Sequence, residues 1–179
     1  MYQTLKQIFR VGIKTEPPPQ VDDALRGKTQ KLHRDVLRTF GRALAIRHVD
    51  AGSCNGCELE IHALSNPYYN IGGLGIHFVA SPRHADMLLV TGPVSRHMEV
   101  ALKRTYDAVP DPKWVVAIGD CGCNGGIFGT GYAICGGVSA VIPVDVAVPG
   151  CPPDPVAILQ GILTAVSEPK SLPKPQKRA

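Results

Sequence analysis

Short, mostly apolar runs alternate with segments of helical periodicity through the middle of the chain. Each run is four or five residues long and is followed within three residues by glycine or proline. Strands buried on both faces of a parallel sheet have this composition, and the helices that join them show apolar residues at three- and four-residue steps. The pattern predicts strands at 46–49, 76–79, 87–90, 115–118 and 144–148, and helices near 57–65, 95–107 and 154–166.

This alternation predicts an α/β domain with a flavodoxin-like, doubly wound parallel sheet and with N- and C-terminal extensions. The 179 residues, 44% of them hydrophobic, suit one domain of this kind. We place the α/β domain at 46–166, a basic N-terminal extension at 1–45 and a basic C-terminal tail at 167–179. Nineteen glycines and sixteen prolines follow no period, which excludes a fibrous or low-complexity chain.

The N-terminal extension contains two predicted helices. The first covers residues 1–14, and the three prolines at 17–19 end its pattern. Its apolar positions fall roughly on one face and its basic positions elsewhere, namely Leu5, Ile8, Phe9 and Ile13 against Lys6, Arg10 and Lys14. Such an amphipathic helix binds a membrane surface, a partner's groove or its own domain, and we favour the first two. A second helix is predicted over roughly 30–43.

The formal net charge of +4 conceals an uneven distribution along the chain. Residues 1–50 hold ten Lys/Arg and five Asp/Glu, residues 51–166 hold five and nine, and residues 167–179 hold four and one. The basic ends have neither interleaved aromatic side chains nor a recognition motif, so we expect no nucleic-acid partner. We expect them to fasten the chain to neighbouring subunits.

Targeting signals and cysteine usage indicate the compartment. No stretch of eighteen or more uncharged apolar residues occurs, so no transmembrane helix is predicted. The first twenty residues show neither a secretory signal nor a twin-arginine pair. We therefore expect a chain that stays in the cytoplasm, where thiols remain reduced. Its six cysteines are then expected to be metal ligands or buried thiols rather than disulfides.

Five of the six cysteines follow predicted strands. Cys54 and Cys57 follow the first strand, Cys121 and Cys123 the fourth, and Cys151 the fifth, whereas Cys135 stands apart in a glycine-rich segment. Because ligands of open α/β sheets bind at the carboxyl ends of the strands, we expect these thiols to meet at one edge.

Four thiolates from three glycine- or proline-shaped loops suit an iron-sulfur cluster. A thioredoxin-type redox pair at the Cys-x-x-Cys turn and a zinc site are the alternatives. Structural zinc usually draws its ligands from compact knuckles, whereas these cysteines are spread over almost a hundred residues. The spread therefore favours the cluster over zinc.

Four segments resemble a known family. They read SCNGCELE at 53–60, SPRHADMLLVTGPV at 81–94, GDCGCNGGIFGTGY at 119–132 and IPVDVAVPGCPPDP at 142–155. They resemble the small, cluster-bearing subunit of membrane-bound, energy-converting [NiFe]-hydrogenases of the formate hydrogenlyase type, and the homologous cluster-bearing subunit of respiratory complex I, which together form the 20 kDa subunit family. The resemblance covers roughly residues 46–166.

The resemblance implies one [4Fe-4S] cluster close to the active site of the large subunit. Its ligands, carried over by position, are Cys54, Cys57, Cys121 and Cys151. Cys123 and Cys135 fall outside the matching positions, although the closeness of Cys123 to Cys121 leaves open which of the two sulfurs binds iron. For Cys135 we expect a small buried hydrophobic side chain.

The first motif separates the two branches of the family. Subunits of complex I resemble adjacent Cys-Cys there, whereas hydrogenase small subunits resemble Cys-x-x-Cys, the spacing of Cys54 and Cys57. The implied function is a relay of electrons between a ferredoxin-like iron-sulfur subunit and the NiFe site of a large subunit, in hydrogen evolution or oxidation.

The hydrogenase branch implies a peripheral position on the cytoplasmic face of the cell membrane, with membrane-arm subunits as further partners. The chain would then belong to an oxidoreductase complex without being catalytic alone, because nothing in it resembles the paired Cys-x-x-Cys motifs that bind nickel and iron. One alternative is a complex I-type subunit that passes electrons to quinone. Another is a zinc-stapled or metal-free interaction module.

Two residues are expected to act beside the cluster. Glu58 directly follows a ligand and is suited either to carry protons near the subunit interface or to stand at a helix N-terminus, where the helix dipole favours a carboxylate, and Glu60 is less suited to a relay. Arg83 is expected to donate to the cluster's surroundings and raise its potential. No histidine pair suggests a ligand, and no phosphate-loop motif suggests a nucleotide or flavin.

Overall fold

A computed structural model describes residues 2–12, 27, 30, 34 and 43–167 of the chain. The helix predicted over 30–43 and the C-terminal tail therefore lie almost entirely outside the described residues.

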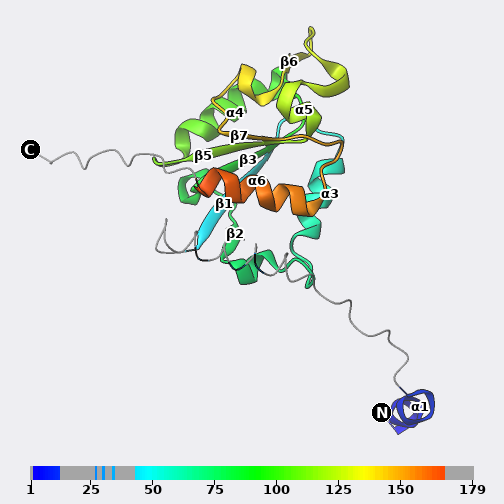
Figure 1. The fold of residues 1–179 in the computed structure, drawn as a ribbon. Helices are drawn as coiled ribbons and strands as arrows, with labels where there is room; N and C mark the ends of the chain where they lie inside the picture. Colours follow the sequence, from blue (N-terminus) through cyan, green and yellow to red (C-terminus); the bar gives the residue numbers. More distant parts are fainter. Residues whose placement is uncertain (1, 13–26, 28–29, 31–33, 35–42, 168–179) are drawn as a thin grey trace, which may run out of the picture.

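Five parallel strands form the central sheet (Figure 1). They are β1 (Leu44–Asp50), β2 (Ile76–Phe78), β3 (Met87–Thr91), β5 (Trp114–Ile118) and β7 (Val146–Val148). Their order across the sheet is β2-β1-β3-β5-β7, which in chain order is the 2-1-3-4-5 arrangement of flavodoxin-like folds. The predicted fold class and all five predicted strands are confirmed.

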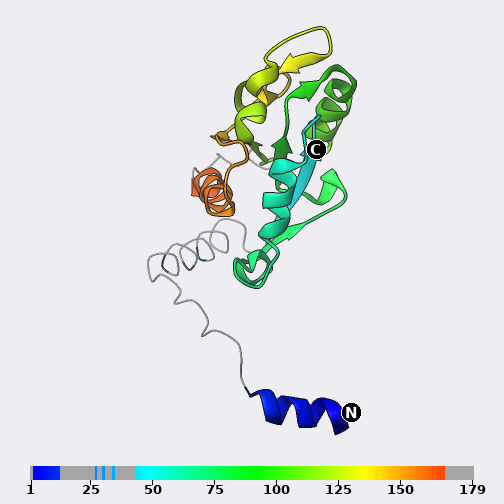
Figure 2. The ribbon, with the colours of Figure 1, turned by 90° about the vertical axis from the view of Figure 1, so that its right-hand side faces the viewer.

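Helices cover both faces of this sheet, because alternate residues of each strand point to opposite sides. Met87 and Leu89 face a core shared with α3 (Gly56–Ala63) and α6 (Pro155–Ser167). Leu88 and Val90 face a second core, to which α4 (Arg96–Ala108) contributes the buried Leu102. The three helices predicted within the domain are confirmed, and Figure 2 shows the resulting layers.

The glycine- and cysteine-rich segment after β5 differs from the expected loop. Residues 119–124 form a short helix, α5 (Gly119–Asn124), which begins directly from the extended Ile118. Gly119 makes this abrupt start possible, because its φ of +82° lies in the left-handed region that favours glycine. Cys121 is therefore held on a helical turn packed against β7, and not on an irregular loop.

Several short elements have no counterpart in the sequence prediction. Strands β4 (Val94–Ser95) and β6 (Ile134–Gly136) form an antiparallel pair outside the main sheet. Four 3₁₀ turns complete the domain: η1 (Ile71–Leu74), η2 (Pro82–His84), η3 (Gly126–Phe128) and η4 (Val138–Ala140). Elements of two to four residues are too short to show a period of hydrophobic positions.

The first predicted helix is present as α1 (Tyr2–Val11), followed by Gly12 at a positive φ of 65°. In Figures 1 and 2, α1 stands clear of the α/β domain. None of the helices in the described part of the chain is long and apolar enough to cross a membrane.

Candidate functional site

Three segments that follow parallel strands supply the four cysteines expected as ligands. Cys54 and Cys57 lie in the turn after β1 and in the first turn of α3, Cys121 lies in α5 after β5, and Cys151 lies in the loop after β7. Cys54 and Cys151 are exposed, and Cys57 and Cys121 are partly buried. The strand-end placement predicted from the sequence is confirmed.

Hydrogen bonds from backbone N–H groups hold these loops in place. After β1, the Asp50 carboxylate accepts hydrogen bonds from the backbone N–H groups of Gly52 and Ser53, both at 2.8 Å. The other two loops are joined directly, because Asp120 N donates to Gly150 O at 2.9 Å and Gly150 N donates to Asp120 Oδ1 at 2.8 Å. Cys121 and Cys151, thirty residues apart, each directly follow one of these two joined residues.

Two glycines let the backbone approach the sulfur atoms closely. A Cβ at Gly119 would stand 2.7 Å from Cys57 Sγ and 3.4 Å from Gly150 O. A Cβ at Gly126 would stand 2.8 Å from Cys121 Sγ. Both glycines have a positive φ, so their conformation and their lack of a side chain are required together. Cys57 Sγ thus lies against the start of α5, which ties the β1 loop to the β5 loop.

The charges that act on Cys57 and Cys121 place the four cysteines in one electrostatic group. Burial first, and then the charges of Glu58, Cys54, Cys121 and Cys151, together raise the pKa of Cys57 to about 12. The pKa of Cys121 is also raised, first by burial and then by Cys151 and Cys54. Thiolates that repel one another in this way are stabilised together when they share a positive metal centre.

Cys123 and Cys135 have other surroundings. The pKa of Cys123 is raised by burial and by Asp120, while a backbone hydrogen bond involving Val148 lowers it. Cys135, on β6, donates a hydrogen bond to Glu99 Oε2 at 3.5 Å and packs against the core that contains Leu102. The side chain of Cys135 is half-buried, somewhat more exposed than expected.

The donor set fits an iron-sulfur cluster. Among the described residues, no three His, Cys, Asp or Glu side chains could hold a metal ion. In a [4Fe-4S] cluster each of four thiolates binds its own iron, so the sulfur ligands stand further apart than those of one ion. The chemistry of the donor set, four thiols from three strand-end loops with glycine backbone beside two of the sulfur atoms, fits such a cluster.

A buried carboxylate lies next to the cysteines. Glu58 is only 7% exposed, and neither of its carboxylate oxygens has a hydrogen-bond partner among the described residues. His48 Nε2, from β1, lies 3.7 Å from Glu58 Oε1 and 3.0 Å from Thr91 Oγ1. Burial lowers the pKa of His48, although Glu58 and Asp50 oppose this shift. Water or a group from outside the domain is therefore needed to satisfy Glu58.

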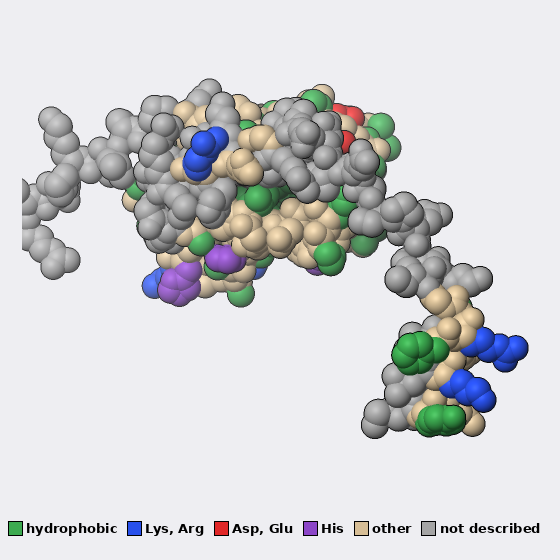
Figure 3. Space-filling model, turned by 60° about the horizontal axis from the view of Figure 1, so that its bottom comes forward, with side chains coloured by type: hydrophobic (Ala, Val, Ile, Leu, Met, Phe, Trp, Pro, Cys, Tyr) green, Lys and Arg blue, Asp and Glu red, His purple; other side chains and the backbone are tan. Residues whose placement is uncertain are grey.

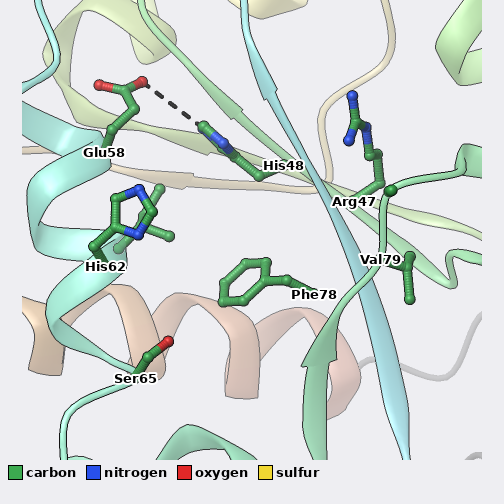
Figure 4. A pocket seen from close by; sticks show the side chains of 9 residues that line it. Arg47, His48, Glu58, His62, Ser65, Phe78 and Val79 are labelled. Atoms are coloured by element: carbon green, nitrogen blue, oxygen red, sulfur yellow. Dashed lines mark ion pairs between the residues drawn. The ribbon is translucent and has the colours of Figure 1, made fainter.

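Figure 4 shows the pocket of about 450 Å³ around this pair, between β1, β2 and α3. It is lined by Arg47, His48, Glu58, Ile61, His62, Ser65, Phe78, Val79 and Ala80. The sequence showed no histidine pair that suggests a ligand, and so pointed to neither His48 nor His62. The only sequence clue to a role for His48 was its place in the strand that leads into the Cys54 turn. Its pairing with Glu58 depends on how α3 packs over β1, which the sequence does not show.

Arg83 lies away from the cysteines. It is exposed in η2, three residues before Asp86, which bonds to Ala45 near the amino end of β1. The cysteine loops follow the carboxyl ends of the strands, at the opposite edge of the sheet. This placement gives no support to a role for Arg83 beside a cluster.

The raised pKa of Cys57 predicts slow alkylation of the cluster-free protein. A pKa of about 12 in place of 9.0 lowers the thiolate fraction at pH 8 about a thousandfold. We expect iodoacetamide to modify Cys57 much more slowly than the exposed Cys54 and Cys151, with a rate at Cys57 that still rises tenfold per pH unit at pH 10. Peptide mass mapping between pH 7 and 10 measures the three rates. Equal rates at pH 8 would contradict the burial of Cys57.

Comparison with known proteins identifies relatives of the whole domain. The family model of the NADH ubiquinone oxidoreductase 20 kDa subunit matches residues 54–165. The chain is 42% identical to formate hydrogenlyase subunit 7 of Escherichia coli over 83% of its own length and 57% of the relative's. It is 43% identical to the probable membrane-bound hydrogenase subunit mbhJ of Pyrococcus furiosus, over 80% of this chain and 86% of that one.

Two further similarities extend the range of complexes. A subunit of the NADH-quinone oxidoreductase of Desulfovibrio desulfuricans is 43% identical over 72% of this chain and 69% of its own length. A chain in the structure of an archaeal membrane-bound sulfane sulfur reductase, a respiratory membrane complex, superposes with a TM-score of 0.63 at 33% identity, over 76% of this chain and 75% of that one. Relatives named for different reactions thus share the domain.

Proposed function

Since the chain belongs to the family of the 20 kDa subunit of NADH ubiquinone oxidoreductase, we propose that it is the electron-transfer subunit of a membrane-bound [NiFe]-hydrogenase complex. One observation carries this proposal: three strand-end loops bring four cysteines into one electrostatic group beside closely approaching glycines. In the proposal, Cys54, Cys57, Cys121 and Cys151 bind one [4Fe-4S] cluster.

A bound [4Fe-4S] cluster supplies a carrier for single electrons. The chain's own contribution is to hold four thiolates and to shield one side of them from water. Cys57 lies on the shielded side, as its raised pKa indicates, whereas Cys54 and Cys151 are exposed. We therefore propose that a partner subunit covers Cys54 and Cys151. Electrons would then cross between the subunits at these exposed ligands, where the path is shortest.

The proposed partners follow from this relay. Electrons would pass between a ferredoxin-like iron-sulfur subunit and the NiFe site of a large subunit, in hydrogen evolution or oxidation, with membrane-arm subunits holding the assembly on the cytoplasmic face of the cell membrane. Relatives named as membrane-bound complexes support this location. The chain itself would carry the electrons and leave the chemistry of hydrogen to the large subunit.

The turn between the first two cysteines favours the hydrogenase branch. Asn55 adopts a left-handed conformation with φ of 72°, and a Cβ at Gly56 would lie 3.6 Å from Cys54 Sγ. Asparagine tolerates the left-handed conformation at Asn55, so the two-residue spacing between Cys54 and Cys57 suits this turn. A second candidate is the reduction of quinone, which the 43% identity to an NADH-quinone oxidoreductase subunit favours.

Glu58 is proposed to hold and pass protons near the interface with the large subunit. Its carboxylate is buried next to Cys57, opens into the pocket beside His48, and lacks a protein donor within the described residues. The evolution or oxidation of hydrogen moves protons as well as electrons, so a carboxylate between the cluster ligands and a pocket lined by His48 and His62 is suited to this role.

Anaerobic purification of the native complex tests the proposed function. We expect about four iron and four sulfide per chain, a reducible cluster signal in electron paramagnetic resonance, and a copurifying large subunit that contains nickel. A colourless chain that contains zinc would overturn the cluster. An iron-sulfur chain that copurifies with a nickel-free partner and reduces quinone would overturn the hydrogenase assignment and support the second candidate.

A further inference from the structure

Helix α1 presents large apolar side chains to solvent. Tyr2 is 78% exposed and Phe9 is 87% exposed. They are seven residues apart, close to two helical turns, so they lie on the same face of the helix. Figure 3 shows hydrophobic side chains on one side of α1, at the lower right of the view, and basic side chains on the other.

A helix with these properties requires a surface that covers it. Helices shorter than about twelve residues are marginal in water, and α1 has ten. Its exposed aromatic side chains add a cost that burial would remove. α1 is therefore expected to be stable as a helix only where something binds its apolar face.

The charges around this face indicate the chemistry of that surface. Lys6 and Arg10 are one helical turn apart and lie beside the apolar face, α1 contains no acidic residue, and the first acidic residue of the chain is Glu16. Aromatic side chains bordered by exposed basic ones match the boundary between acyl chains and anionic headgroups, where Lys and Arg extend their charges outward.

We propose that α1 lies in the interface of an anionic lipid bilayer, with Tyr2 and Phe9 in the acyl boundary and Lys6 and Arg10 at the headgroups. This contact adds a direct lipid anchor to the membrane-bound complex of the proposed function. It depends on that function only for the presence of a membrane, since no cysteine takes part in it.

Vesicle cosedimentation of the full chain tests the anchor. We expect binding to vesicles of phosphatidylcholine and phosphatidylglycerol at 3:1, weak binding to pure phosphatidylcholine, and weaker binding as salt is raised. Phe9→Ser should weaken binding about tenfold or more, because the buried phenyl ring is lost. The double change Lys6→Gln and Arg10→Gln should weaken it about thirtyfold. Tyr132→Ser, at a fully exposed aromatic in the α/β domain, is the matched control and should change nothing.

Other outcomes would overturn the proposal. Equal binding to both vesicle types, or no binding of the full chain to either, would do so. Unchanged vesicle binding by Phe9→Ser together with loss of copurifying subunits would also do so, and would make α1 a protein-docking helix. Iron content separates this test from the proposed function. All α1 variants should keep the iron of the parent chain, whereas failure of the proposed function would appear as a chain without iron whatever its lipid binding.

Discussion

Replacing Cys151 by serine is expected to remove or convert the iron-sulfur cluster. Cys151 is the single cysteine of its loop. A serine hydroxyl is a poorer ligand for iron than a thiolate, because it is harder and far less acidic. We expect bound iron to fall from about four per chain to below one, or the cluster signal to change its shape. Iron and sulfide assays with electron paramagnetic resonance, after anaerobic purification, measure both outcomes.

Cys135→Ser and Cys123→Ser are the matched controls. Both should keep full iron content, because Cys135 bonds to Glu99 on α4 and no other thiol contributes to the pKa shift of Cys123. Serine can donate the same hydrogen bond to Glu99, so Cys135→Ser should also leave the fold unchanged. A cluster that survives Cys151→Ser but not Cys123→Ser would reverse the ligand assignment.

The sheet could be predicted because its strands are buried on both faces. Runs such as 87–90 and 115–118 are entirely apolar, and each ends at glycine within two residues. Once five parallel strands are in place, the rule that ligands gather at carboxyl ends brings Cys54, Cys121 and Cys151 to one edge. The fold and the gathering of the cysteines therefore follow from local sequence together with one rule of topology.

Side-chain pairings across elements could not be predicted in the same way. The approach of His48 to Glu58 depends on the packing of α3 over β1, which no local pattern encodes. The same holds for Arg83. Its neighbourhood in sequence resembles that of cluster-bearing relatives, but the segment from η2 to Asp86 bonds to Ala45, near the amino end of β1. A motif gives the identity of a residue, and the strand direction decides which edge it reaches.

The conversion of Gly119 to alanine is expected to disturb the cluster while the domain remains folded. An alanine Cβ would stand 2.7 Å from Cys57 Sγ, too close for both atoms to keep their positions. Cys57 is the most shielded of the proposed ligands, and its sulfur would have to turn away from the site. We expect loss of more than half of the bound iron, measured per folded chain, with the sheet's circular dichroism retained.

Gly129→Ala separates the close contact from the backbone strain. Gly129 also has a positive φ, of 58°, but a Cβ there meets no atom within 4 Å. Alanine disfavours a positive φ at both positions, and Gly129, with φ of 58° and ψ of −133°, lies outside the left-handed helical region, so Gly129→Ala carries at least as large a backbone cost. Only Gly119→Ala also places a Cβ too close to a sulfur atom, that of Cys57. If both variants lose the same fraction of iron, strain in the surrounding loops governs cluster binding. If Gly119→Ala alone loses it, the contact between the start of α5 and Cys57 aligns ligands from two different strand ends.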